Sequence, residues 1–85
     1  MLVEYEKSFL KALDNLPAGI EEKFYGRLEL FQQNPVHPLL RNHSVEPAYP
    51  GCRSINVTGD YRAIFRQKGG VITFLYIGTH SQLYG

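Results

Sequence analysis

Seven polar side chains in the second half of the chain have the chemistry needed to cleave RNA. They are His43, Arg53, Asn56, Asp60, Arg62, His80 and Tyr84. Metal-free cleavage requires the 2′-hydroxyl to lose a proton, the phosphorane to be stabilised by positive charge, and the leaving 5′-oxygen to gain a proton. Imidazoles suit both proton transfers because their ordinary pKa of ~6.5 lies near neutral pH. Guanidinium groups suit the phosphorane charge.

Metal binding is the competing interpretation of these side chains. His43, Asp60 and His80 could form a site of two histidines and one carboxylate. None of them belongs to a short-range ligand motif, and the neighbouring arginines oppose a cation. Cys52 is the only cysteine, so neither an internal disulfide nor a cysteine-rich zinc site can form. We therefore expect no metal and no cofactor.

Three strands in the second half must position these side chains. Residues 52–57 alternate, with Arg53 on the same face as two apolar residues and Asn56 on the other face. The chain turns and returns as a strand over residues 61–66, and Lys68-Gly69-Gly70 predicts a hairpin. Residues 71–77 are apolar on both faces, which is typical of a central strand. Pairing of these strands would bring most of the polar set to one end of a sheet.

The first half predicts a short strand and two helices. Residues 2–5 have strand composition, and Ser8 is the expected cap of a first helix with apolar residues at helical spacing. A second helix is expected from about residue 18 until Asn34-Pro35 stops it. We therefore predict one α+β domain over residues 1–85, with a two-helix hairpin packed across one face of a mostly antiparallel sheet.

Composition and charge narrow the class of protein. No apolar run approaches the roughly 20 residues that span a membrane, and the N-terminus lacks the pattern of a signal peptide, so we expect a cytoplasmic protein with no membrane partner. Residues 1–40 carry a net charge of −2, whereas residues 41–85 carry +3 and four of the five arginines. An arginine-rich half favours a polyanionic partner, although an ordinary fluctuation between helices and strands gives the same pattern.

Three sequence motifs resemble those of the RelE-type toxins, and of their YafQ-like branch in particular. Gly51-Cys52-Arg53-Ser54 followed by Gly59-Asp60-Tyr61-Arg62-Ala63-Ile64-Phe65 is similar to the core motif of that superfamily. The ending Ile77-Gly78-Thr79-His80-Ser81-Gln82-Leu83-Tyr84 is similar to the ending of the YafQ-like branch, and Asn42-His43-Ser44-Val45 matches its histidine before the second strand. The first half agrees more loosely, so the resemblance covers nearly the whole chain.

The resemblance implies a RelE-like fold and the function of a toxin in a type II toxin–antitoxin system. Such toxins enter the ribosomal A site and cleave the exposed mRNA codon through attack by the 2′-hydroxyl. The implied partners are a cognate antitoxin, which silences the toxin, and the ribosome with its mRNA. Operator DNA would be contacted only indirectly, through the antitoxin complex.

The resemblance also implies roles for individual residues. His43 matches the candidate general base, Asp60 an acidic residue implicated in catalysis, and His80 the group that protonates the leaving oxygen or supports the phosphate. Tyr84 matches an aromatic residue that stacks on a base or orients it.

The remaining residues correspond to RNA contacts. Arg62 matches an arginine that steadies the scissile phosphate, and Arg53 one that contacts the RNA backbone. Asn56 stands where YafQ-like proteins have a second strand-borne histidine. Asparagine can hydrogen-bond a phosphate but cannot transfer a proton near neutral pH.

Two other functions are compatible with the sequence. A ParE-like toxin shares this fold and poisons DNA gyrase without nuclease chemistry, but that branch does not need the pair His43 and His80. A catalytically weak homologue that only binds an antitoxin, as a co-repressor, is the other alternative, and Asn56 and the near-neutral charge keep it open.

Overall fold

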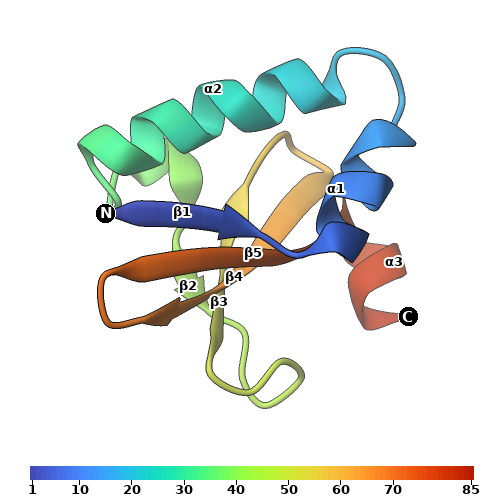
Figure 1. The fold of residues 1–85 in the computed structure, drawn as a ribbon. Coiled ribbons are helices and arrows are strands. Elements are labelled where there is room, and N and C mark those ends of the chain that lie inside the picture. Colours follow the sequence, from blue (N-terminus) through green and yellow to red (C-terminus); the bar gives the residue numbers. More distant parts are fainter.

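The computed structural model describes all 85 residues as an α+β fold (Figure 1). In chain order the elements are β1 (Leu2–Tyr5), α1 (Lys7–Asp14), α2 (Ile20–Gln33), the 3-10 helix η1 (Pro38–Leu40), β2 (His43–Ser44), β3 (Cys52–Asn56), β4 (Tyr61–Lys68), β5 (Val71–Thr79) and α3 (His80–Tyr84). One five-stranded sheet has the order β1-β5-β4-β3-β2. All its pairs are antiparallel except β1 with β5, which is parallel. The predicted fold class is confirmed.

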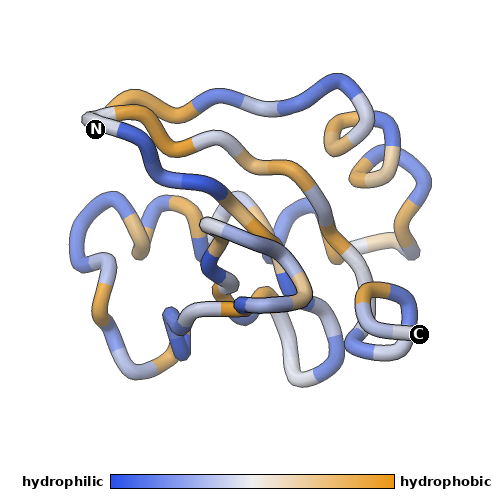
Figure 2. The backbone as a smooth tube through the Cα atoms, turned by 90° about the horizontal axis from the view of Figure 1, so that it is seen from below, coloured by the Kyte–Doolittle hydropathy of each residue, from blue (hydrophilic) through white to orange (hydrophobic).

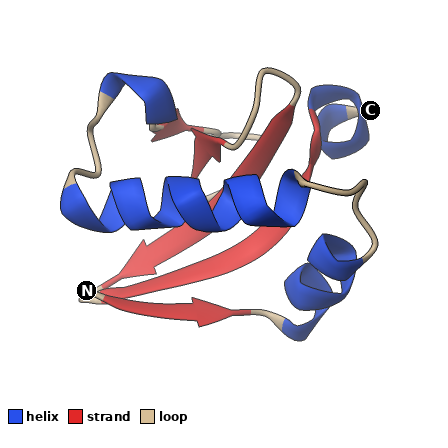
Figure 3. Ribbon diagram, turned by 90° about the horizontal axis from the view of Figure 1, so that it is seen from above, coloured by secondary structure: helices blue, strands red, loops and turns tan.

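Helices α1 and α2 cover one face of the sheet, with α2 running across the strands (Figures 1 and 3). The core lies between these two layers and contains 13 buried residues. Phe74 of β5 is at its centre: its ring centroid lies 5.6 Å from that of Phe9, 5.1 Å from that of Phe24 and 5.6 Å from that of Phe65. The opposite face of the sheet, which we call the open face, has no such helical layer.

Strand β5 occupies the central position that its apolar residues predict, between β1 and β4. The β4–β5 hairpin turns at Gly69, whose φ of 61° is in the left-handed region that favours glycine. Pairing then runs from Lys68↔Val71 to Tyr61↔Thr79, with one interruption. Between the pairs Ile64↔Tyr76 and Phe65↔Phe74, residue 75 has no partner, so β5 contains a β-bulge.

The first helix does not begin as predicted. It starts at Lys7 with Glu6 at the N-cap, and no side chain caps it, so the prediction of Ser8 as the cap is wrong. The backbone N–H of Glu6 donates to the carbonyl of Phe74 at 2.9 Å, and the Glu6 carbonyl accepts from Leu10. Helix α1 therefore begins where the chain leaves the sheet. Helix α2 begins after Gly19 and ends before Asn34, as the sequence predicts.

The C-terminal residues His80–Tyr84 form helix α3, an element that the sequence analysis did not predict. Thr79 Oγ1 accepts from the backbone N–H of Gln82 at 3.2 Å, and Gln82 Oε1 accepts from the backbone N–H of Thr79 at 2.8 Å. This reciprocal pair is a capping box, and its sequence signature, threonine followed three residues later by glutamine, is present in the chain. The helix fixes the orientation of the C-terminal site residues.

Candidate active site

The open face carries a row of residues that crosses three strands near the β3–β4 turn. Asn56 of β3 pairs with Arg62 of β4, which pairs with Gly78 of β5. Paired residues share a face, so the Asn56 and Arg62 side chains lie beside each other, and both are half-buried. Arg27 and Arg53 donate hydrogen bonds to neighbouring groups, whereas the Arg62 guanidinium makes no hydrogen bond within the protein. Arg62 is therefore a free cation on this row.

Asp60 and His80 follow this row at the same end of the sheet. The last pair of the β4–β5 ladder is Tyr61↔Thr79, and Asp60 and His80 lie directly beyond it on their two strands. The backbone N–H of Asp60 donates to Thr58 Oγ1 at 3.2 Å, which holds the turn. Both the Asp60 carboxylate and the His80 imidazole are exposed. The sequence predicts that strand pairing brings most of the polar set to one end of the sheet. The observed pairing does so for Asn56, Asp60, Arg62 and His80.

Tyr84 joins this group through α3. One turn of helix separates it from His80, and the two ring centroids lie 4.8 Å apart with an interplanar angle of 38°. A further tyrosine, Tyr49 from the loop between β2 and β3, packs edge-on against Tyr84 with centroids 5.6 Å apart. Tyr84 is 37% exposed, so part of its ring is free to stack on a base.

Two residues that the sequence analysis did not single out hold α3 in place. A Cβ on Gly78 would lie 3.0 Å from Gln82 Oε1 and 3.3 Å from Gln82 Cβ, so the absence of a side chain lets α3 pack directly on β5. The Tyr49 hydroxyl donates to the carbonyl of Leu83. Burial, and next the neighbouring Tyr84 and Tyr76, raise the pKa of Tyr49, which keeps the phenol protonated as a donor. The Tyr49 contact has no local sequence signal, because Tyr49 and Leu83 are 34 residues apart in the chain.

His43 lies on the open face, where its pairing with Ser54 makes it a diagonal neighbour of Asn56, but it is distant from His80. Its Nδ1 is 2.6 Å from the carbonyl of Arg41, which can only accept, so Nδ1 is the donor, and Nε2 makes no hydrogen bond within the protein. Strand β2 is at the edge of the sheet, three strand spacings from β5, which is about 14 Å. The structure therefore does not bring His43 and His80 to a single phosphate.

Arg53 also lies outside the cluster. It pairs with Phe65 and so belongs to the helix-covered face, as the alternation of residues 52–57 predicts. Its Nε donates to Asn42 Oδ1 at 2.8 Å and its Nη2 to the Asn42 carbonyl at 3.4 Å. These bonds fix the chain before β2.

The two remaining chemical features of the site concern metals and the thiol. No three of the histidine, cysteine, aspartate and glutamate side chains come close enough to hold a metal ion. Burial raises the pKa of the Cys52 thiol, while Arg66 lowers it and Glu46 raises it further. The net increase keeps the thiol neutral near pH 7, which is the form without nucleophilic reactivity.

The helix pair on one face of the five-stranded sheet, with α3 beside the open face, is the fold of RelE-like toxins. The family model described as "ParE toxin of type II toxin-antitoxin system, parDE" matches residues 3–84. The chain therefore belongs to this family of toxins, within the RelE/ParE superfamily. A search of curated proteins found no match.

Solved structures of toxins have the same fold. YafQ from E. coli strain BL21(DE3) has a TM-score of 0.78 and 22% sequence identity, over 98% of this chain and 97% of that one. RelE in the RelB–RelE complex from Methanococcus jannaschii has a TM-score of 0.75 and 21% identity, over 95% and 94%. The YoeB/ParE toxin from Agrobacterium tumefaciens has a TM-score of 0.75 and 16% identity, over 94% and 99%. At these identities the likeness is one of fold.

The longest helix, α2, has 14 residues, and no helix combines the length and apolar character that crossing a membrane requires.

Proposed function

We propose that this toxin is an mRNA endoribonuclease that acts on the ribosome without a metal. The observation that carries the proposal is the gathering of Asn56, Asp60, Arg62, His80 and Tyr84 at one end of the open face. This group combines a free guanidinium, a carboxylate, an imidazole and a partly exposed ring.

In the proposed reaction the RNA 2′-oxygen attacks the adjacent phosphorus, the bond from phosphorus to the 5′-oxygen breaks, and a 2′,3′-cyclic phosphate remains. The Asp60 carboxylate accepts the proton of the 2′-hydroxyl, and the His80 imidazolium donates a proton to the leaving 5′-oxygen. Arg62 and the Asn56 amide hold the phosphate oxygens as charge develops. Tyr84 stacks on a base and so positions the bond to be cleaved.

His43 and Arg53 take other roles in this proposal. The free Nε2 of His43 suits a base, but its position on β2 serves a proton transfer only if the RNA extends across the open face. We therefore propose that His43 contacts RNA away from the scissile phosphate, and that Arg53 supports β2 through Asn42. Asn56 cannot replace a histidine in proton transfer, so His80 is the only imidazole in the cluster.

The proposed partners are a cognate antitoxin, the ribosome and its mRNA. YafQ and RelE have been solved as toxin–antitoxin complexes, with DinJ and RelB. By analogy of fold, an antitoxin would cover the toxin described here, and operator DNA would be reached only through that complex.

Inhibition of DNA gyrase is the second candidate function, because the matching family model is that of the ParE toxins. That activity needs no proton transfer, so the clustered Asp60, Arg62 and His80 would have no chemical role in it.

One pair of assays separates the two functions. Purified toxin is added to translating ribosomes, and the ends of the mRNA fragments are determined; in parallel, it is added to a DNA gyrase supercoiling reaction. The ribonuclease proposal predicts fragments that end in a 2′,3′-cyclic phosphate and unaltered supercoiling. Intact mRNA with inhibited supercoiling would contradict the proposal and support gyrase as the target.

A further inference from the structure

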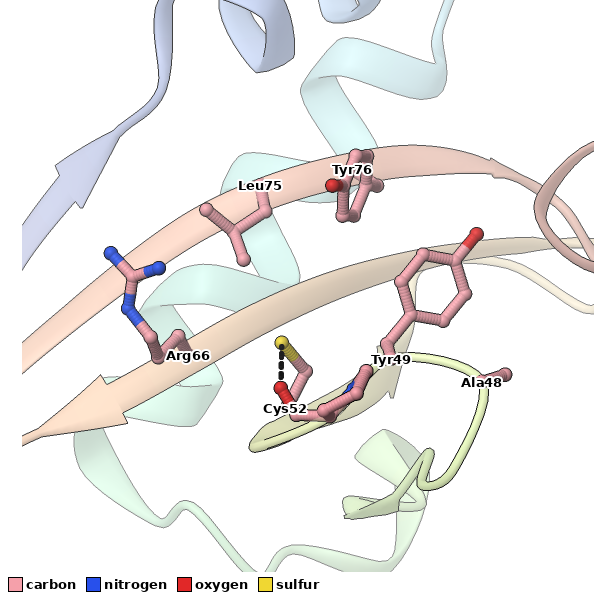
Figure 4. Close-up of a pocket in the computed structure, with 7 residues that line it drawn as sticks. Ala48, Tyr49, Cys52, Arg66, Leu75 and Tyr76 are labelled. Atoms are coloured by element: carbon pink, nitrogen blue, oxygen red, sulfur yellow. Dashed lines mark hydrogen bonds between the residues drawn. The ribbon is translucent and has the colours of Figure 1, made fainter.

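The open face contains a hollow of about 380 Å³ beside the candidate active site (Figure 4). This volume lies within the range of about 300–1,000 Å³ that is typical of small-molecule sites. Its chemically distinctive lining residues are Tyr49, Cys52, Arg66, Leu75 and Tyr76. None of them belongs to the group of residues assigned above to the cleavage reaction.

The β-bulge in β5 creates this lining. Adjacent strand residues normally point to opposite faces, but residue 75 is the extra residue of the bulge. Leu75 packs against the small cluster of buried residues on the open face, and Tyr76 shares that face through its pairing with Ile64. Both side chains therefore line one hollow, and Tyr76 is 46% exposed.

The hollow has an aromatic end and a cationic end (Figure 4). At the aromatic end the Tyr49 and Tyr76 rings lie with centroids 5.1 Å apart and an interplanar angle of 49°, and the exposure of Tyr76 leaves ring surface open to a ligand. Leu75 and the neutral thiol of Cys52 provide uncharged surface between the two ends. Arg66 lies at the other end, exposed and without an ion pair.

We propose that this hollow binds the base of an RNA nucleotide adjacent to the one held at Tyr84, and that Arg66 contacts the phosphate of that nucleotide. The inference rests on the proposed function, because it places a second nucleotide of the same RNA. An aromatic face suits stacking of any base, and a guanidinium suits the phosphate.

Two features connect the hollow with the cleavage site. Tyr49 contacts Tyr76 within the hollow and Tyr84 at the cleavage site, with centroid distances of 5.1 and 5.6 Å. Arg62 and Arg66 are four residues apart on one face of β4, which separates them by about 13 Å along the strand. This separation is too long for one phosphate, so the two cations would hold different phosphates of one strand.

One negative charge opposes the proposed ligand. Glu46 lies close enough to raise the pKa of Cys52, yet it does not line the hollow. Its charge weakens phosphate binding at Arg66, so Glu46→Gln should strengthen RNA binding about twofold to threefold, whereas Arg66→Gln should weaken it.

The test measures binding of RNA to the whole toxin without ribosomes, and so does not depend on cleavage. The probe is a fluorescein-labelled 2′-O-methyl adenosine hexamer, which lacks the attacking hydroxyl and cannot be cut, and its affinity is measured by fluorescence anisotropy. Tyr76→Leu removes the aromatic face and keeps apolar bulk. Its matched control is Tyr25→Leu, because Tyr25 on α2 is 43% exposed and lies on the other side of the sheet. Lys68→Gln, on the same strand but outside the hollow, is the control for Arg66→Gln.

Tyr76→Leu is expected to weaken binding about fivefold to a hundredfold, as loss of one stacked base predicts, with Tyr25→Leu unchanged. Hexamers in which one position lacks its base identify the nucleotide that is bound in the hollow. At that position, removing the base and replacing Tyr76 together should weaken the free energy of binding by less than the sum of the two separate losses. Equal affinities for the Tyr76 and Tyr25 variants, or additive losses at every position, would overturn the inference and leave an apolar side chain of a protein partner as the alternative occupant. Absence of binding by the wild type would overturn it too. Cleavage on ribosomes tests the proposed function separately.

Discussion

Among single residues, Tyr49 makes the contacts that join the parts of the open face. Its hydroxyl donates to the carbonyl of Leu83, and its ring contacts Tyr76 on one side and Tyr84 on the other. It belongs to a loop, yet its partners lie on β5 and α3. This side chain therefore contributes both to the packing of α3 and to the orientation of Tyr84.

Replacing Tyr49 with phenylalanine should lower the free energy of unfolding by about 1 kcal/mol, because the Leu83 carbonyl loses its donor while the ring contacts remain. Urea denaturation followed by circular dichroism measures the change. An unchanged unfolding midpoint would mean that this hydrogen bond does not stabilise α3.

Burial of the same side chain should make the free energy of unfolding depend on pH in the alkaline range. The fold raises the pKa of Tyr49 above its ordinary value of 10.0, so the neutral phenol is the form that the native state favours. Its contribution is complete below pH 10 and is lost as the pH rises through the higher folded pKa. Urea midpoints at pH 8 and above pH 10 should fall more for the wild type than for Tyr49→Phe. Equal decreases would assign the effect to other groups, such as Tyr5, whose pKa is also raised.

A third prediction at this scale separates the two candidates for the general base, Asp60 and His43. Asp60→Asn should lower the rate of mRNA cleavage about a hundredfold or more, because the carboxylate accepts the proton in the proposed reaction. His43→Ala should cost less than Asp60→Asn, since β2 holds His43 about 14 Å across the sheet from β5. Single-turnover cleavage rates decide the order. The reverse order would place His43 at the reacting phosphate and require the RNA site to extend to the sheet edge.

At the scale of elements, α3 converts the end of β5 into part of a site. A capping box begins the helix at Thr79, and the missing side chain at Gly78 allows it to pack on the sheet. Figure 2, seen from the side away from α2, shows the chain coiling into this short helix at its C-terminal end. The proposed cleavage site is therefore built from the ends of strands and a single helical turn. Such a site is sensitive to small displacements of the helix.

Gly78→Ala should displace α3. The new Cβ would lie 3.0 Å from Gln82 Oε1, and relief of that contact moves the capping residue, so mRNA cleavage should fall about tenfold or more with the sheet intact. Gly70→Ala is the matched control, because nothing lies within 4 Å of its new Cβ and the position is at the far hairpin. Wild-type cleavage by the Gly78 variant would show that α3 tolerates displacement.

Elements with a strong local pattern could be predicted from the sequence. The strands over residues 2–5, 52–57 and 61–66, the second helix and the Gly69 hairpin follow from periodicity and turn residues, and the structure confirms them. Ser8 failed as a cap because a backbone bond from Glu6 to β5 fixes the start of α1. The bulge in β5 and the contacts of Tyr49 depend on strand partners distant in the chain, and local patterns contain no information on them.

At the scale of the whole molecule, the two faces of the sheet have different tasks. The phenylalanine core and helices α1 and α2 stabilise one face, which leaves the open face free for polar and aromatic groups. On the open face, Asn56, Asp60, Arg62, His80 and Tyr84 form the proposed cleavage site, and the hollow beside Tyr76 continues it. We therefore expect an RNA strand to lie across this face.

The rate at which the toxin cleaves an mRNA on translating ribosomes, compared between wild type and His80→Ala, tests the central claim most directly. His37→Ala is the matched control, because His37 lies before η1 and outside the site. Loss of the proton donor should lower the rate by about 10²- to 10⁴-fold, with the His37 variant unchanged and every fragment ending in a 2′,3′-cyclic phosphate. Equal rates for wild type and His80→Ala, or no cleavage by the wild type, would contradict the claim that this toxin is a ribonuclease that uses His80.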